Sequence, residues 1–238
     1  MRLGLGLGIG VGGGAPPWTP AALGSSLLMW LRADSGVTLN GATVSAWADR
    51  SATGRNASQA DAAKQPTYTA SDANLNGMPS LTFDGTADNI VTAMPSTVVQ
   101  PVTLMVVGYS DASTNRIAID GADATRIILL KDLSQNVAAY AGTTITSTTT
   151  WTNQKRAMLF EANGASSAVY LDGFTTAVKT GNAGAGSFKG VTIGANAGAT
   201  QQFWSGSIAE VLAVSGASAA IRTSLMRYAA SRYAITLT

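Results

Sequence analysis

Short apolar runs, each ending in a turn signal, recur along most of the chain. The runs occupy residues 79–83, 102–109, 126–130, 156–161, 168–171, 191–193 and 206–214. Each is followed within three residues by Gly, Asp or Asn, which favour tight turns. This spacing is typical of antiparallel β-structure. Residues 102–107 are apolar at five of six positions, which predicts a strand covered on both faces.

One local signal predicts a hairpin. Asp172-Gly173 separates residues 169–171 from residues 174–176, and Asp-Gly readily adopts the positive backbone angles of a two-residue type I′ turn. We therefore expect the two flanking segments to pair as adjacent strands.

Only the C-terminal segment has a helical pattern. Ser218 is suited to cap a helix, and Ile221, Leu225, Tyr228 and Arg232 follow at spacings of four, three and four. These spacings place the four side chains on one helical face, and a serine hydroxyl at the N-cap accepts from a free backbone N–H. We expect one short helix to close an otherwise all-β domain.

The first residues differ from the rest of the chain. Residues 1–14 form a Gly-rich arm in which apolar side chains recur at every second position: Leu3, Leu5, Leu7, Ile9 and Val11. In an extended chain these side chains lie on one face. We predict an arm that docks onto a partner by strand addition, with a flexible leader as the alternative. Residues 15–24 form a Pro-containing linker, and residues 25–238 form the folded domain.

Composition excludes several kinds of chemistry. The 238 residues include no Cys and no His, which removes thiol nucleophiles, disulfides, Cys/His zinc sites and Ser-His-Asp triads. The 15 basic and 13 acidic residues are scattered, so nothing indicates nucleic acid binding. The longest apolar segment, residues 3–11, is too short to span a membrane. The two glutamates, Glu161 and Glu210, are not spaced as paired glycosidase carboxylates, so we expect no catalytic residues.

Tryptophans are the main candidates for ligand contact. Trp18 lies in the Pro-containing linker and Trp151 follows three threonines, so we expect both to be exposed or at an interface. Aromatic rings stack on sugars, which makes Trp151 and Trp204 candidates for contact with a glycan or another partner. Packing in the core is the alternative and the commoner use of Trp.

Asp84, Asp88 and Asn89 lie in an oxygen-rich segment after a predicted strand. Carboxylate and amide oxygens are ligands for Ca²⁺, but a calcium site normally needs six or more oxygens. A tight turn explains the same residues, since Asp and Asn cap turns and Gly85 supplies an unusual backbone angle. We favour the turn, with structural calcium as the alternative, and expect no other cofactor.

Several segments resemble, in order, the elements of concanavalin A-like, laminin-G-like jelly rolls. They are residues 28–34 (LMWLRAD), 47–51 (WADRS), 54–57 (GRNA), 66–68 (PTY), 81–88 (LTFDGTAD), 169–173 (VYLDG) and 206–211 (GSIAEV). The resemblance spans residues 25–235 and implies a two-sheet antiparallel β-sandwich with Trp30 and Trp47 in the core. That fold serves glycan binding, adhesion, glycan hydrolysis and architecture, so it does not settle function.

The alternating Leu-Gly start, joined to such a domain, resembles structural proteins of phages and prophages. We therefore expect a non-enzymatic virion protein, a head decoration, fibre or tail component, present in multiple copies. Its arm would bind other virion proteins, and its sandwich would be displayed toward a host-surface glycan. The alternative is a secreted or cell-surface module for carbohydrate binding or adhesion, which would need a cleaved N-terminal signal.

Overall fold

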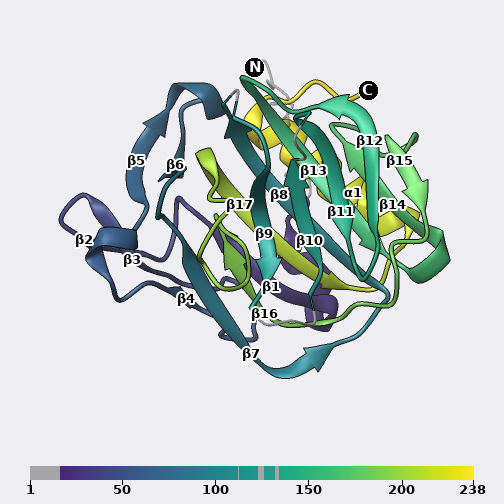
Figure 1. The fold of residues 1–238 in the computed structure, drawn as a ribbon, viewed down its shortest axis with the longest axis horizontal. Helices are drawn as coiled ribbons and strands as arrows, with labels where there is room; N and C mark the ends of the chain where they lie inside the picture. Colours follow the sequence, from purple (N-terminus) through teal and green to yellow (C-terminus); the bar gives the residue numbers. More distant parts are fainter. Residues whose placement is uncertain (1–16, 112, 123–125, 132–133) are drawn as a thin grey trace, which may run out of the picture.

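The computed structural model describes residues 17–111, 113–122, 126–131 and 134–238. The predicted docking arm, with Leu3, Leu5, Leu7, Ile9 and Val11, lies outside these residues. The described chain is all-β apart from one α-helix and four short 3₁₀ turns (Figure 1). The turns are η1 (Pro20–Ser26), η2 (Ala62–Lys64), η3 (Ala73–Leu75) and η4 (Gly164–Ser166).

Every strand pairing is antiparallel, and the strands form two branches. In the first branch β17 pairs on one side with both β1 and β6, and on the other side the order is β8, β13, β14, β15. The bounds are β1 (Leu27–Arg32), β6 (Met78–Asp84), β8 (Val102–Ser110), β13 (Gln154–Ala162), β14 (Ser167–Leu171), β15 (Lys179–Gly181) and β17 (Ser205–Ser215).

The second branch runs in the order β4, β7, β16, β9, β10, β11, β12. Its bounds are β4 (Ala57–Ser58), β7 (Ile90–Val98), β9 (Arg116–Gly121), β10 (Ile128–Lys131), β11 (Asn136–Tyr140), β12 (Thr144–Thr150) and β16 (Phe188–Ile193).

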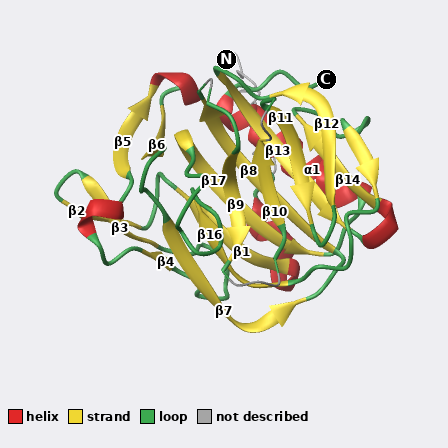
Figure 2. Cartoon of the chain, in the orientation of Figure 1, coloured by secondary structure: helices red, strands yellow, loops and turns green. Residues whose placement is uncertain are grey.

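Three further strands join the branches at one edge: β2 (Val37–Asn40), β3 (Thr43–Trp47) and β5 (Thr67–Asp72). β5 pairs with β6 and β3, and β3 also pairs with β2 and β4. The pairing is therefore continuous, and the strands curve into a nearly barrel-shaped domain (Figure 2). The all-β prediction is confirmed, but the predicted division into two separate sheets is not, because this edge connects the branches.

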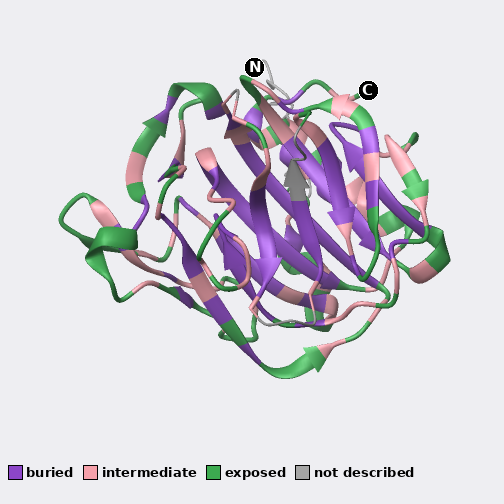
Figure 3. Cartoon of the chain, viewed as in Figure 1, coloured by how far each residue is buried: buried purple, intermediate pink, exposed green. Residues whose placement is uncertain are grey.

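The main core lies between the branches. Leu104 and Val106 of β8 face it, together with Phe160 of β13 and Val191 and Ile193 of β16. Trp47 lies in this core and is 0% exposed, whereas Trp30 lies in the second core beneath the helix and is 3% exposed, so the predicted burial of both is confirmed. Full burial of one Val, Leu, Ile or Phe side chain contributes about 1.5–3 kcal/mol relative to exposure, so the many buried apolar residues of this cluster together stabilise the fold. Figure 3 shows the buried positions running along the central strands.

A second core forms where α1 (Ala219–Tyr233) covers the outer face of the first branch. Met105 and Val107 of β8 pack there with Leu225 and Met226 of the helix. Alternate residues of β8 thus enter opposite cores, as the apolar run at residues 102–107 predicts. The N-cap prediction is also confirmed, since the Ser218 hydroxyl accepts from the backbone N–H of Ile221 at 3.3 Å.

The predicted Asp172-Gly173 hairpin is wrong. β14 pairs with residues 179–181, and residues 174–176 do not join the sheet. The Asp172 carboxylate accepts from the Ala157 backbone N–H and the Arg156 guanidinium, both at 2.7 Å. These contacts hold the turn against β13, and Phe174 packs against the second core instead. A longer loop therefore replaces the two-residue turn.

No helix in the described part of the chain combines the length and apolar character needed to cross a membrane.

Candidate functional site

The exposed indole of Trp18 lies between two adjoining hollows, called here the Trp18 hollows. Their volumes are about 360 and 400 Å³, and both are lined by Pro17, Trp18, Tyr228 and Ser231. Trp18 is 37% exposed, and its ring meets the Tyr228 ring edge-on with centroids 6.1 Å apart. These volumes are typical of pockets for small molecules, and two aromatic rings form their shared wall.

A short turn fixes Trp18 beside the helix. Pro20 occupies the first turn of η1 and is buried, and the Ala22 N–H donates to the Thr19 carbonyl at 3.0 Å. Proline suits this position because its ring presets a helical φ and no N–H is needed there. Leu23 then packs against the second core, so the indole rests against α1.

Two arginines that line one Trp18 hollow, Arg32 and Arg232, pair with Asp34, which lies outside that hollow, and we call these three side chains the ion triad. Arg32 Nε lies 2.5 Å from Asp34 Oδ1, and Arg232 Nη2 pairs with Asp34 Oδ2. Burial opposes ionisation of Asp34, but the hydrogen bonds and charges of both arginines hold the pKa of this carboxyl below its usual range. The carboxylate therefore stays charged and fixes both guanidinium groups.

A buried carboxylate beneath the site holds Tyr228. Glu210, 0% exposed, accepts from Tyr228 Oη at 2.9 Å, from Tyr233 Oη at 2.7 Å and from Trp30 Nε1. Burial raises the pKa of Glu210, and these three donors act in the opposite direction. Arg32 Nη1 also donates to Tyr228 Oη at 3.3 Å. The Tyr228 ring that supports Trp18 is thus anchored from β17 and β1.

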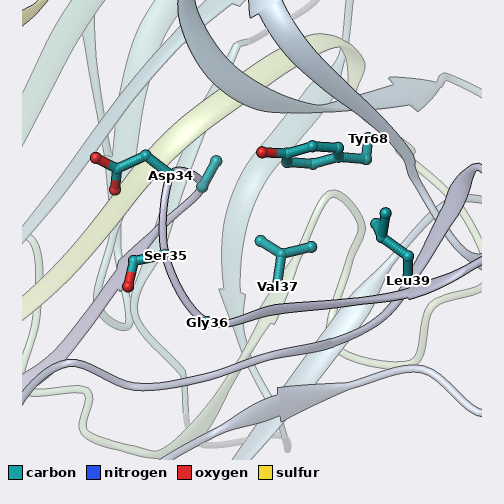
Figure 4. Close-up of a pocket in the computed structure, with 7 residues that line it drawn as sticks. Asp34, Ser35, Gly36, Val37, Leu39 and Tyr68 are labelled. Atoms are coloured by element: carbon teal, nitrogen blue, oxygen red, sulfur yellow. The ribbon is translucent and has the colours of Figure 1, made fainter.

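A third hollow, of about 250 Å³, opens on the other side of Asp34. Figure 4 shows the Tyr68 ring above Val37, with its hydroxyl end turned toward the Asp34 side. Leu39 lies beside this ring and is 48% exposed. Since Asp34 lines this hollow and its two arginine partners line a Trp18 hollow, the ion triad separates two concave surfaces.

The predicted exposure of Trp151 is wrong, and the two rings proposed for glycan contact are both enclosed. Trp151 and Trp204 are each 1% exposed and meet edge-on with centroids 5.1 Å apart. Trp151 Nε1 donates to the Gln154 carbonyl at 2.8 Å, and its backbone N–H donates to the Gln135 carbonyl at 3.0 Å. Packing is therefore the role of both rings, because neither leaves a face for a sugar.

The Asp84 segment forms the tight turn favoured over a calcium site. Asp84 Oδ1 accepts from the backbone N–H groups of Thr86, Ala87 and Asp88 at 2.8, 2.9 and 3.2 Å. Asp88 Oδ2 in turn accepts from the Asp84 N–H at 3.0 Å. Both carboxylates thus bind the backbone of their own turn, and Gly85 has the positive φ of 77° that this turn requires.

Asn89 completes the turn rather than facing solvent. Its amide donates to the Ala87 carbonyl at 2.9 Å, and its side-chain oxygen accepts from Gln59 Nε2 at 2.8 Å. Within the described residues, no three Asp, Glu, His or Cys side chains gather as a metal would require.

Both glutamates serve the attachment of α1. Arg222 Nη1 lies 2.7 and 2.8 Å from the two carboxylate oxygens of Glu161, and Glu210 binds the tyrosines of the same helix. They lie on β13 and β17, on opposite sides of β8, facing Thr103 and Val107 in register. Glu161 and Glu210 are 6% and 0% exposed, and neither lines the hollows described above.

No family model matches this chain, and no curated protein matches it. Solved structures do match. A sialidase of Trypanosoma rangeli in complex with sialic acid aligns with a TM-score of 0.55 and 16% identity, over 84% of this chain and 32% of that protein. The chain therefore spans about a third of the length of that sialidase.

Two other likenesses cover larger shares of the matched chains. The binding domain of botulinum neurotoxin serotype G aligns with a TM-score of 0.61 and 9% identity, over 86% of this chain and 51% of that chain. Domain 4 of a GH43 arabinanase from Geobacillus stearothermophilus, in complex with arabinotriose, aligns with a TM-score of 0.51 and 14% identity, over 68% of this chain and 80% of that chain. At these identities the likeness defines the fold alone.

Proposed function

We propose that this domain is a non-catalytic carbohydrate-binding module of the jelly-roll type, whose ligand lies against Trp18. The observation that carries the proposal is the exposed Trp18 ring, held edge-on by Tyr228 between two hollows. An aromatic face stacks on the apolar side of a sugar ring. The same hollows are lined by side chains whose polar groups can form hydrogen bonds with the hydroxyls of a sugar: Thr223, Ser224, Ser231, Asn76 and Arg232.

The fold neighbours support this proposal. The matched sialidase carries sialic acid and the matched arabinanase domain carries arabinotriose. An arabinofuranosidase in complex with arabinofuranosyl-xylobiose also aligns, with a TM-score of 0.61 and 11% identity over 80% of this chain and 51% of that chain. A fold of this kind hosts many functions, so the proposed function rests mainly on the Trp18 surface and less on the likeness to these structures.

The proposal that the module is non-catalytic rests on where its two glutamates lie. Glycoside hydrolysis uses two carboxyl groups facing the scissile bond. Glu161 is held by Arg222, and Glu210 is enclosed by two tyrosines and Trp30. Incubation with a panel of polysaccharides is expected to release no reducing ends, and their appearance would contradict this part of the proposal.

Glycan binding by the full chain tests the proposal directly. We expect a glycan array to show binding that Trp18→Ala strongly weakens. Leu39→Ala, which alters the third hollow, and Val99→Ala, which removes another exposed apolar side chain, should bind as the unchanged protein does. Binding by a folded Trp18→Ala protein with unchanged affinity would overturn the proposal.

A virion role is a second proposal, and it rests on the alternating aliphatic residues of the arm. Leu3, Leu5, Leu7, Ile9 and Val11 would add a strand to a capsid or tail protein, and many copies on one particle would convert weak glycan contacts into avidity. Deletion of residues 1–14 should then abolish incorporation into particles. Unchanged occupancy of the truncated protein, or a mature protein lacking residues 1–15, favours the secreted or cell-surface module.

A further inference from the structure

The charged side chains that line the Trp18 hollows are all cationic. They are Arg32, Arg227 and Arg232, and no acidic side chain among the described residues lines either hollow. The whole chain has a net charge of only +2, so this concentration is local. Asp34 pairs with Arg32 and Arg232 from outside these hollows, and the buried Glu210 also attracts Arg32. Among the described residues, the positive charge of Arg227 is left without an acidic partner.

Two of these cations are fixed in position before any ligand arrives. Asp34 holds Arg32 and Arg232, whose side chains remain 15% and 21% exposed. A guanidinium group presents several N–H donors in one plane and pairs with planar or tetrahedral oxyanions. Because the ion triad has already ordered these long side chains, a ligand would lose less conformational entropy on binding them.

Arg227 supplies a cation on the other side of Trp18. It is an exposed residue of α1, its guanidinium lies 5.3 Å from the Phe174 ring centroid, and within the described chain no carboxylate pairs with it. The contact with Phe174 orients the guanidinium without neutralising it. Thr223 and Ser224, one turn earlier on the helix, add hydroxyl groups to the same hollow.

From this arrangement we infer that the ligand of the Trp18 hollows is an acidic glycan, whose carboxylate or sulfate group lies against the arginines while a sugar ring stacks on Trp18. The inference rests on the proposed carbohydrate-binding function and narrows its ligand class. A neutral sugar would use the aromatic wall and the hydroxyls but would leave the positive charge of Arg227 without a counter-charge. The attraction between the anionic group of the ligand and the arginines is screened less by solvent in a partly enclosed site than it would be on an open surface.

Matched pairs of glycans test the inference in the full-length protein. The probes are 3′-sialyllactose against the methyl ester of its sialic acid, a glucuronate disaccharide against its glucose counterpart, and galactose 6-sulfate against galactose, measured by titration calorimetry. The first two pairs report a carboxylate and the third a sulfate. We expect at least one acidic probe to bind about tenfold or more tightly than its neutral partner, with the preference weakening as salt is raised.

Two variants separate the charge from the aromatic wall. Arg227→Gln should lower the affinity for the acidic probe about threefold to tenfold and leave its neutral partner unchanged, whereas Trp18→Ala should weaken both. Lys189→Gln removes an exposed cation from β16 in the second branch, away from the helix, and should leave both affinities unchanged.

Failure of the acidic-ligand inference and failure of the proposed carbohydrate-binding function give different results. If neutral and acidic partners bind equally, and Trp18→Ala weakens both, the acidic class is wrong and the carbohydrate-binding function stands. If no glycan on the array or among the probes binds, the proposed function fails and this inference fails with it. If a single-stranded oligonucleotide binds as tightly as the best acidic probe, the arginines attract polyanions in general, and the inference is overturned.

Discussion

The hydroxyl of Tyr233, in the last turn of α1, donates a 2.7 Å hydrogen bond to the buried carboxylate of Glu210 in β17. Tyr228 and Trp30 donate to the same carboxylate. One acidic side chain therefore joins the helix α1 with the neighbouring strands β17 and β1. Because Tyr228 is also the wall behind Trp18, this buried acid positions the proposed binding surface.

Glu210→Leu is expected to destabilise the protein by more than about 3 kcal/mol, since each buried donor left without an acceptor costs about 1–3 kcal/mol. Glu210→Gln keeps one acceptor oxygen and should lose less. Urea denaturation followed by tryptophan fluorescence measures both. If Glu210→Leu were as stable as the unchanged protein, the hydrogen bonds to this carboxylate would not be what holds the helix.

Asp88→Asn is expected to raise stability at pH 7. Burial, with repulsion from Asp84, raises the pKa of Asp88 to about 6 in the folded protein, against 3.8 for the free side chain. A raised pKa in an acid means that its contribution to stability is complete below pH 3.8 and is lost as pH rises through about 6. The gain from the substitution should therefore be present at pH 7 and disappear at acidic pH in a series of thermal melts.

Asp84→Asn is the matched control with the opposite sign. Burial opposes ionisation of Asp84, but hydrogen bonds from the Thr86 hydroxyl and from backbone N–H groups outweigh it and lower its pKa to about 2. Its contribution is present above pH 3.8 and is lost as pH falls through about 2. This substitution should lower stability at pH 7, and a gain would contradict the turn described here.

Arg222→Met is expected to destabilise the protein by about 3–5 kcal/mol, because it leaves the carboxylate of Glu161 buried without its counter-charge. Arg222 also donates to the Phe174 carbonyl at 2.8 Å and lies 4.3 Å from the Tyr170 ring centroid. The double variant with Glu161→Leu should recover most of the loss, because no unpaired charge then remains. Chemical denaturation of the two variants and of the unchanged protein checks this, and a double variant no better than the single one would argue against it.

Trp151→Ala is expected to cost about 3–5 kcal/mol through the cavity it opens beside Trp204. Trp151→Phe, which fills more of that space, should leave glycan binding unchanged. Trp18→Ala should show the reverse pattern, with little effect on the melting temperature and loss of binding. A loss of binding in a well-folded Trp151→Phe protein would restore the original interpretation of that residue as a ligand contact.

Local patterns were sufficient for elements whose environment follows from neighbouring residues. The apolar run of β8 predicted a strand that is covered on both faces, as the two cores confirm. The Ser218 cap, with the spacings of four and three residues between Ile221, Leu225 and Tyr228, predicted α1. The turn at Asp84 also followed from residues within five positions of one another. The strands β11 and β12 carry weaker signals, since together they hold only two aliphatic β-branched residues, Val137 and Ile145, that enter the core.

The sequence by itself determined an all-β domain closed by one helix and without Cys or His chemistry, because hydrophobic period, turn residues and composition are local properties. Only the tertiary structure decided that Trp151 is enclosed, that Asp172 binds back to β13, and that Trp18 lies on Tyr228. Trp30 donates a hydrogen bond to Glu210, which lies 180 positions further along the chain, and Asp34 accepts one from Arg232, which lies 198 positions further along. Such long-range contacts depend on the order in which the strands pair, and no short stretch of sequence encodes that order.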